Sequence, residues 1–163
     1  MKIRFLSIFA AAALLAACES APTDTGAKAG AGQSTPPTTT TTGVAAGSIA
    51  EFNNVAGDRV FFDYNKSNIT GDAKATLDKQ VAWLKKYPNY AITVEGHCDE
   101  RGTREYNLAL GDRRATAVKN YLVAAGLPAA RVKTISYGKE RPAELGSNEA
   151  AWAKNRRGVT VLQ

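Results

Sequence analysis

Between positions 60 and 162 the apolar residues change repeatedly from the two-residue period of a strand to the 3.6-residue period of a helix. Strand patterns are expected at 60–62, 90–95, 132–137 and 158–162, and helix patterns at 70–86, 103–125 and, in a shorter form, 147–154. This order of strand, helix, strand, helix, strand, short helix and strand predicts an α+β domain whose long helices cover one face of a sheet.

The apolar positions within these segments indicate which side chains form the core. Leu77, Val81 and Leu84 share one face of the first long helix. Ile92 and Val94 alternate with polar residues in the second strand, so they lie on the same side of it. We expect these five side chains to be buried between helix and sheet.

A different kind of segment precedes this domain. Lys2 and Arg4 are followed by an apolar run over positions 5–17, which ends in small residues. The run is shorter than the roughly 20 residues that a helix needs to cross a bilayer. A basic start, a short apolar stretch and small residues at the end are typical of a secretory signal peptide, here residues 1–17.

The end of this signal, Leu15-Ala16-Ala17-Cys18, resembles the lipobox of bacterial lipoproteins. This resemblance implies that the Cys18 thiol is lipidated, that cleavage occurs before it, and that the new amino terminus is acylated. Two or more acyl chains give stable anchoring. Glu19 follows, where an aspartate would imply retention in the inner membrane. The expected location is therefore the outer membrane, with the domain facing the periplasm; the alternative is an ordinary signal followed by a coincidental cysteine.

Residues 18–50 have the composition of a tether. They contain eight Thr, five Gly and three Pro, and no aromatic residue. Such a segment cannot bury enough apolar surface to offset the entropy of ordering it. We therefore expect a flexible tether at 18–50 and a single domain at 51–163. Export also argues against a nucleic-acid partner, although the formal net charge is +6.

One cationic residue lies on the apolar face of the second long helix. A row of residues four positions apart runs along this face: Leu110, Arg114, Val118 and Leu122. Asn107 lies on the same face. An arginine in such a row has to reach solvent, pair with an acid or bind a ligand. A structural ion pair with a nearby acid is the alternative to a binding role.

The segment between the second strand and the second long helix is the other candidate site. It reads Gly96-His97-Cys98-Asp99-Glu100-Arg101-Gly102, and ligands commonly bind where a strand turns into a helix. A thiol enzyme that uses Cys98 with His97 is a weak alternative, because adjacent residues of an extended chain point to opposite faces. A metal site is equally weak, because the chain has one His and lacks ligand spacing. With Cys18 lipidated, Cys98 has no partner, and we expect it to be buried.

Four ordered motifs resemble the OmpA-like peptidoglycan-binding domain family over about residues 60–162. They read FDYN at 62–65, VEGHCDERG at 94–102, YNLALGDRRA at 106–115, and SYGKERP at 136–142 with NRR at 155–157. The resemblance implies a sandwich of a mixed sheet and helices. Cys98 departs from the family, where small residues such as Ala or Thr are familiar.

The family binds meso-diaminopimelate in the stem peptide of peptidoglycan. Carried over by motif, Asp99 is expected to pair with the ammonium of this ligand, and Arg114, assisted by Asn107, with its carboxylate. Asn65 and Arg156 match positions that line the same pocket. The resemblance implies noncovalent binding with no catalytic residue, no metal and no cofactor.

The resemblance also implies partners. Lipid-anchored members of the family hold the outer membrane to peptidoglycan, bind TolB and other Tol proteins, and act in envelope integrity and constriction at division. The alternative within the same family is a wall-binding lipoprotein outside the Tol system.

Overall fold

The computed structural model describes residues 44–163. The predicted signal peptide, Cys18 and most of the predicted tether lie outside the described residues. The strands are β1 (Arg59–Phe61), β2 (Ile92–His97), β3 (Val132–Gly138) and β4 (Arg157–Leu162). The helices are α1 (Ile49–Val55), α2 (Gly71–Lys86), α3 (Arg104–Ala124) and α4 (Glu149–Asn155), with a 3₁₀ turn at Ala129–Arg131.

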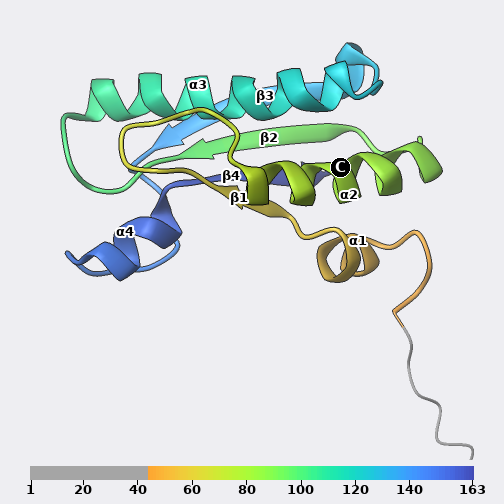
Figure 1. The fold of residues 1–163 in the computed structure, drawn as a ribbon, viewed down its shortest axis with the longest axis horizontal. Helices are drawn as coiled ribbons and strands as arrows, with labels where there is room; N and C mark the ends of the chain where they lie inside the picture. Colours follow the sequence, from red (N-terminus) through yellow and green to blue (C-terminus); the bar gives the residue numbers. More distant parts are fainter. Residues whose placement is uncertain (1–43) are drawn as a thin grey trace, which may run out of the picture. The chain divides into compact units, whose positions relative to one another are not determined.

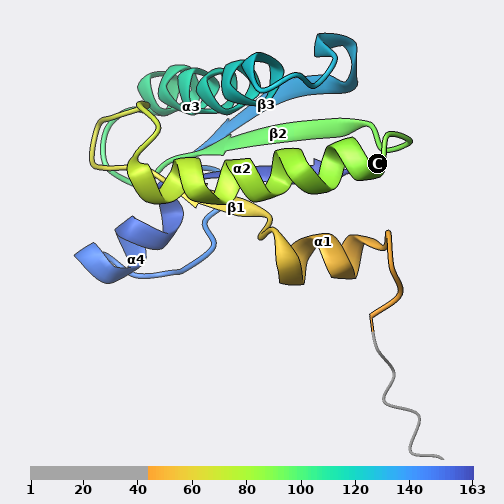
Figure 2. The same ribbon diagram turned by 45° about the vertical axis from the view of Figure 1, so that its right-hand side comes forward.

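The four strands form one mixed sheet in the order β1-β4-β2-β3. β4 pairs antiparallel with both β1 and β2, and β2 pairs parallel with β3. The long helices α2 and α3 lie along the sheet, with α3 beside β3 (Figures 1 and 2). This confirms the predicted α+β class and the predicted order of elements.

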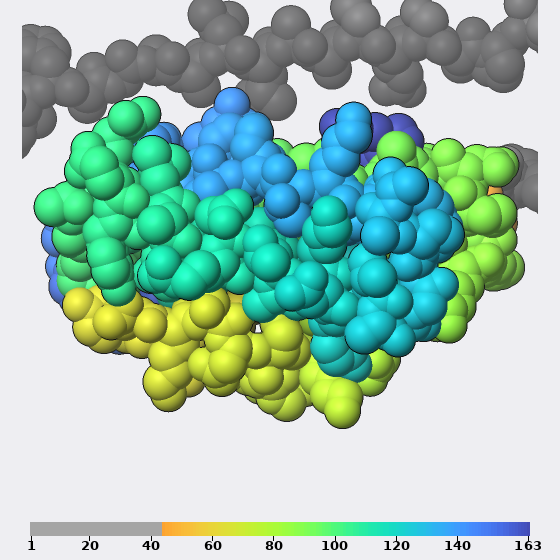
Figure 3. All heavy atoms as spheres, turned by 90° about the horizontal axis from the view of Figure 1, so that it is seen from above, coloured from red at the N-terminus to blue at the C-terminus, as the bar shows by residue number. Residues whose placement is uncertain are grey.

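The core lies between the two long helices and the sheet. All five side chains assigned to it from their spacing, Leu77, Val81, Leu84, Ile92 and Val94, are buried there. The burial of such apolar side chains supplies the main favourable term in folding. Seen from above, α3 is flanked by the segment that follows β1 on one side and by β3 on the other (Figure 3).

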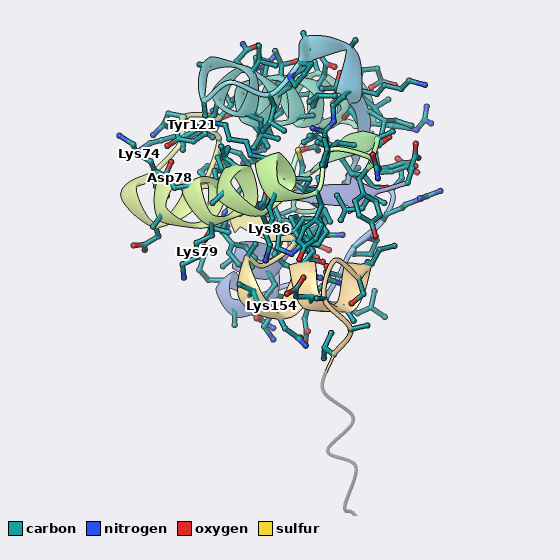
Figure 4. The ribbon with its side chains drawn as sticks, turned by 90° about the vertical axis from the view of Figure 1, so that its right-hand side faces the viewer. Lys74, Asp78, Lys79, Lys86, Tyr121 and Lys154 are labelled. Carbon is teal, nitrogen blue, oxygen red and sulfur yellow. The ribbon has the colours of Figure 1, made fainter. Side chains whose placement is uncertain are left out.

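The two long helices are also joined by a polar contact. The Tyr121 hydroxyl of α3 donates to Asp78 of α2, and Figure 4 shows the two side chains together between the helices. Strand β2 extends to His97, two residues past its expected end. Gly96 continues the pairing with β3 opposite Ser136, and His97 pairs with Gly138 after a register shift between the two residues. The end of this extended strand leads directly into Cys98 and Asp99, which line the candidate site.

Helix α1 was not expected from the sequence and begins two residues before the predicted start of the domain. Ser48 caps it, and Phe52 is fully buried with its ring edge-on to Trp83 at 5.1 Å. Glu51 accepts from Trp83 Nε1 at 2.9 Å, and Tyr90 donates to the carbonyl of Gly47 at 2.6 Å. These contacts fix the point where the chain enters the domain. None of the helices in residues 44–163 combines the length and apolarity needed to cross a membrane.

Candidate functional site

The candidate site lies at the end of β2, where α3 approaches the strand with no side chain between the two backbones. A Cβ added at Gly96 would come within 1.8 Å of the carbonyl oxygen of Gly111, and one at Gly111 within 2.3 Å of Ser136 Oγ. Only glycine permits so close an approach. Asn107 and Arg114, about one helical turn to either side of Gly111, are thereby held against the end of the strand.

Arg114 is fully buried and is bound by backbone carbonyls from two separate segments. Its guanidinium donates from Nε to Lys66 O (2.9 Å), from Nη1 to His97 O (2.8 Å) and from Nη2 to Asp63 O (3.1 Å). Among residues 44–163 no carboxylate lies within ion-pair distance of it. Burial lowers its pKa. A guanidinium has five N–H groups, so two remain for another acceptor.

Asp99 is the buried anion of the site and is already surrounded by donors. Its Oδ1 accepts from the backbone N and the Nε of Arg101, both at 3.2 Å. Its Oδ2 accepts from Arg101 Nη2 at 2.7 Å and from Arg156 Nη1 at 3.4 Å. Burial raises the pKa of this carboxyl, but the hydrogen bonds from Arg101 outweigh burial, and the pKa lies below its usual value. Asp99 is therefore held as a carboxylate.

A pocket of about 160 Å³ opens beside Asp99 and Arg114. It is lined by Tyr64, Asn65, Cys98, Asp99, Arg101, Gly102, Tyr106, Asn107, Leu110 and Arg114. The fold thus brings together four of the five residues predicted for the ligand: Asp99, Arg114, Asn107 and Asn65. An anion and a cation separated by a small polar pocket can bind a ligand that carries both charges.

The fifth predicted residue, Arg156, does not line this pocket. It lies behind Asp99, where its Nε donates to Phe62 O at 3.0 Å and its Nη2 to Glu149 at 2.7 Å. Its contact with Asp99 makes it a residue that positions the carboxylate. Arg156 instead lines a second, larger hollow of about 570 Å³, which is bounded by β1, α2 and α4. It contains neither Asp99 nor Arg114.

Asn107 and Cys98 secure the walls of the pocket. The Asn107 amide donates to the carbonyls of Arg101 (2.8 Å) and Thr103 (3.0 Å), so its nitrogen holds the loop between β2 and α3. Cys98 is buried, as expected, and its thiol donates to the carbonyl of Asn107 at 3.3 Å. Burial raises the pKa of this thiol. It is therefore a poor source of the thiolate that a nucleophile requires.

Three lining residues had no role assigned from the sequence: Tyr64, Arg101 and Tyr106. Tyr64 and Tyr106 expose large aromatic surfaces at the rim, and Tyr106 donates to Asn65, which has a left-handed backbone with φ 55°. Exposed tyrosines next to a loop of charged residues are a usable signal of a binding site. Nothing in the sequence marked Arg101 as a site residue. An arginine two positions after an aspartate in a loop of charged residues does not stand out.

His97 is a buried titratable group beside this site. Its Nε2 faces Glu95 at 3.3 Å, and Nδ1 has no hydrogen-bond partner among residues 44–163. Burial lowers its pKa to about 4, with smaller contributions from Arg157 and Arg141. Within residues 44–163 no three His, Cys, Asp or Glu side chains gather as a metal site would need.

Acid is therefore expected to destabilise the domain before its carboxylates titrate. The unfolded chain takes up a proton on His97 near pH 6.5, whereas the folded chain does not do so until about pH 4. The free energy of unfolding should fall by about 2 kcal/mol between pH 7 and 5. Urea denaturation at both pH values measures this fall, and His97→Gln should remove most of it. An equal fall in the free energy of unfolding of both proteins would contradict the assignment of this pH dependence to His97.

Comparison with known proteins places the chain in a family. The model of the OmpA family matches residues 61–156, and the chain belongs to that family. It is 55% identical over 133 residues to the peptidoglycan-associated lipoprotein of Rhizobium meliloti (strain 1021), covering 82% of this chain and 70% of the relative. The crystal structure of the peptidoglycan-associated lipoprotein from Burkholderia pseudomallei is 41% identical with a TM-score of 0.65, covering 68% of this chain and 96% of that one.

Proposed function

We propose that this chain is an outer-membrane lipoprotein whose domain binds peptidoglycan noncovalently through the meso-diaminopimelate of the stem peptide. One observation carries the proposal: Arg114 is a fully buried cation with no carboxylate partner among the described residues, and it lines the same pocket as the carboxylate Asp99. Relatives named peptidoglycan-associated lipoprotein support the same class of ligand.

The free end of diaminopimelate carries one ammonium and one carboxylate on the same carbon. A site for it needs an anion and a cation a few ångströms apart, in surroundings that exclude water. The two N–H groups that Arg114 does not use on backbone carbonyls are available to the carboxylate. Asp99, kept ionised, suits the ammonium. Binding requires no covalent step, and the buried thiol of Cys98 takes no part in it.

The proposal assigns each part of the chain a mechanical role. Acyl chains on Cys18 hold the protein to the outer membrane, the residues between Cys18 and Gly47 span the gap, and the domain that begins with the capped helix α1 holds the wall. By likeness to the peptidoglycan-associated lipoproteins, we extend the proposal to partnership with TolB and other Tol proteins, in envelope integrity and constriction at division.

Binding to isolated sacculi tests the proposal. The mature chain carrying Cys18→Ser, which lacks only its lipid, should bind sacculi whose stem peptides contain meso-diaminopimelate. Asp99→Asn should weaken binding about 10- to 100-fold, because a charge-assisted hydrogen bond contributes about 1.5–3 kcal/mol. Co-sedimentation over a range of protein concentrations measures the change. Asp112→Asn, which removes an exposed acid of α3, is the matched control and should bind like the parent chain.

The role of Arg114 can be tested without changing that buried residue. Sacculi in which the diaminopimelate carboxylate is amidated, or in which lysine replaces diaminopimelate, leave Arg114 without its anion. Both should bind about 10-fold or more weakly, because a site built for a polar group rejects ligands that lack it. Equal binding to all three walls, together with full binding by Asp99→Asn, would refute the proposed function.

A further inference from the structure

The carboxylate assigned to the ligand has no free acceptor site. A carboxylate offers about four lone-pair positions. Two on Oδ1 are taken by the backbone N and the Nε of Arg101, and two on Oδ2 by Arg101 Nη2 and Arg156 Nη1. A ligand ammonium can reach Asp99 only if one of these donors leaves.

The two arginines differ in how firmly they are held. Arg156 is buried, and its other nitrogens donate to Phe62 O and Glu149. The Arg101 side chain is 29% exposed, and among residues 44–163 its one ionic contact besides Asp99 is Glu149, whose Oε2 is 3.9 Å from its Nη1. Arg101 is therefore the donor that can be exchanged.

The Arg101 guanidinium has other contacts that can hold it once it leaves Asp99. Its guanidinium lies 4.0 Å from the ring centroid of Tyr64 and 4.0 Å from that of Trp152. A cation–π contact persists while the cation stays over the ring face within about 6 Å of the centroid. Glu149 is exposed, and its Oε2 lies 3.9 Å from Arg101 Nη1. A small movement toward Glu149 would keep Arg101 between the rings and free two positions on Asp99.

We propose that Arg101 is an internal counter-ion that occupies the place of the ligand's ammonium on Asp99, and that it sets the affinity of the site. This inference rests on the proposed function. Binding then exchanges one ion pair for another, so its net free energy is smaller than that of an ammonium meeting a free carboxylate. A site of this design holds the wall reversibly and remains neutralised when empty.

Arg101→Met tests the inference, because methionine keeps an unbranched, flexible apolar stem but removes the guanidinium and its charge. The unlipidated mature chain carrying Arg101→Met should bind a soluble muropeptide containing meso-diaminopimelate about 10-fold more tightly than the parent chain. Arg101→Lys, which restores a cation, should return the affinity toward that of the parent. Titration calorimetry measures both.

Two controls separate a competing charge from a structural effect. Arg104→Met removes an exposed arginine at the first position of α3, whose partner is the exposed Glu140, and should leave the affinity within about two-fold. A muropeptide whose free ammonium is acetylated has nothing to place on Asp99. Arg101→Met should not tighten its binding, whereas a general change in pocket shape would alter both ligands alike.

The possible failures are distinguishable. If Arg101→Met binds the unmodified muropeptide no more tightly than the parent chain, while Asp99→Asn still weakens binding as expected, the counter-ion role is wrong and the proposed function stands. If Asp99→Asn and acetylation both leave binding unchanged, the diaminopimelate site itself is wrong, and the role of Arg101 falls with it.

Discussion

Gly96→Ala is expected to leave the chain unfolded at 25 °C. The added Cβ would lie 1.8 Å from the carbonyl oxygen of Gly111, and the clash is between two backbones. No rotamer change relieves it. The central strand β2 is held on both sides by β3 and β4, so α3 would have to move away from the sheet. A cost above about 5 kcal/mol is comparable with the whole stability of a small domain.

Circular dichroism and urea denaturation measure this effect directly. Gly71→Ala is the matched control, because a Cβ at Gly71, the first residue of α2, meets nothing within 4 Å. It should leave stability unchanged or raise it slightly, since alanine is the better helix former. Two variants that unfold at the same urea concentration would show that α3 and β2 are not in backbone contact.

Arg114→Leu is expected to destabilise the domain by about 3–5 kcal/mol and to abolish wall binding. The substitution leaves the carbonyls of Lys66, His97 and Asp63 without their common donor. These carbonyls come from the loop after β1 and from the end of β2, so one guanidinium joins the two segments. Leucine fills only part of the space and supplies no hydrogen bond.

The neighbouring arginine provides the control. Arg113 lies on the exposed side of α3, and Arg113→Leu should change stability by less than about 0.5 kcal/mol. Both proteins are compared by urea denaturation at pH 7 and by sedimentation with sacculi. A stable Arg114→Leu that still binds the wall would contradict both the carbonyl contacts and the proposed role of this residue.

The sequence predicted that Arg114 lies on the apolar stripe of its helix, because the spacing of Leu110, Val118 and Leu122 determines the face. It could not predict what satisfies the guanidinium. The acceptors are main-chain carbonyls, and every residue has one, so they leave no trace in the sequence. The same limit applies to Asn107, whose amide holds two loop carbonyls.

Other features escaped prediction for different reasons. Helix α1 is short and has a single buried anchor, Phe52, so it shows no repeating apolar pattern. The place of Arg156 behind Asp99 depends on how α4 packs against the loop after β1. The order of strands and long helices along the chain was predictable, because the apolar periods of these elements extend over many residues.

Helix α1 lies toward the end of the sheet where β2 begins (Figure 1), whereas the pocket residues Cys98 and Asp99 directly follow the other end of β2. Tyr90 and Trp83, which hold α1, precede β2, and the pocket begins where β2 ends. Tension between a membrane anchor and the wall would therefore run along the strands. Pulling in this direction loads the hydrogen bonds of the sheet in shear, all at once, instead of unzipping them one by one.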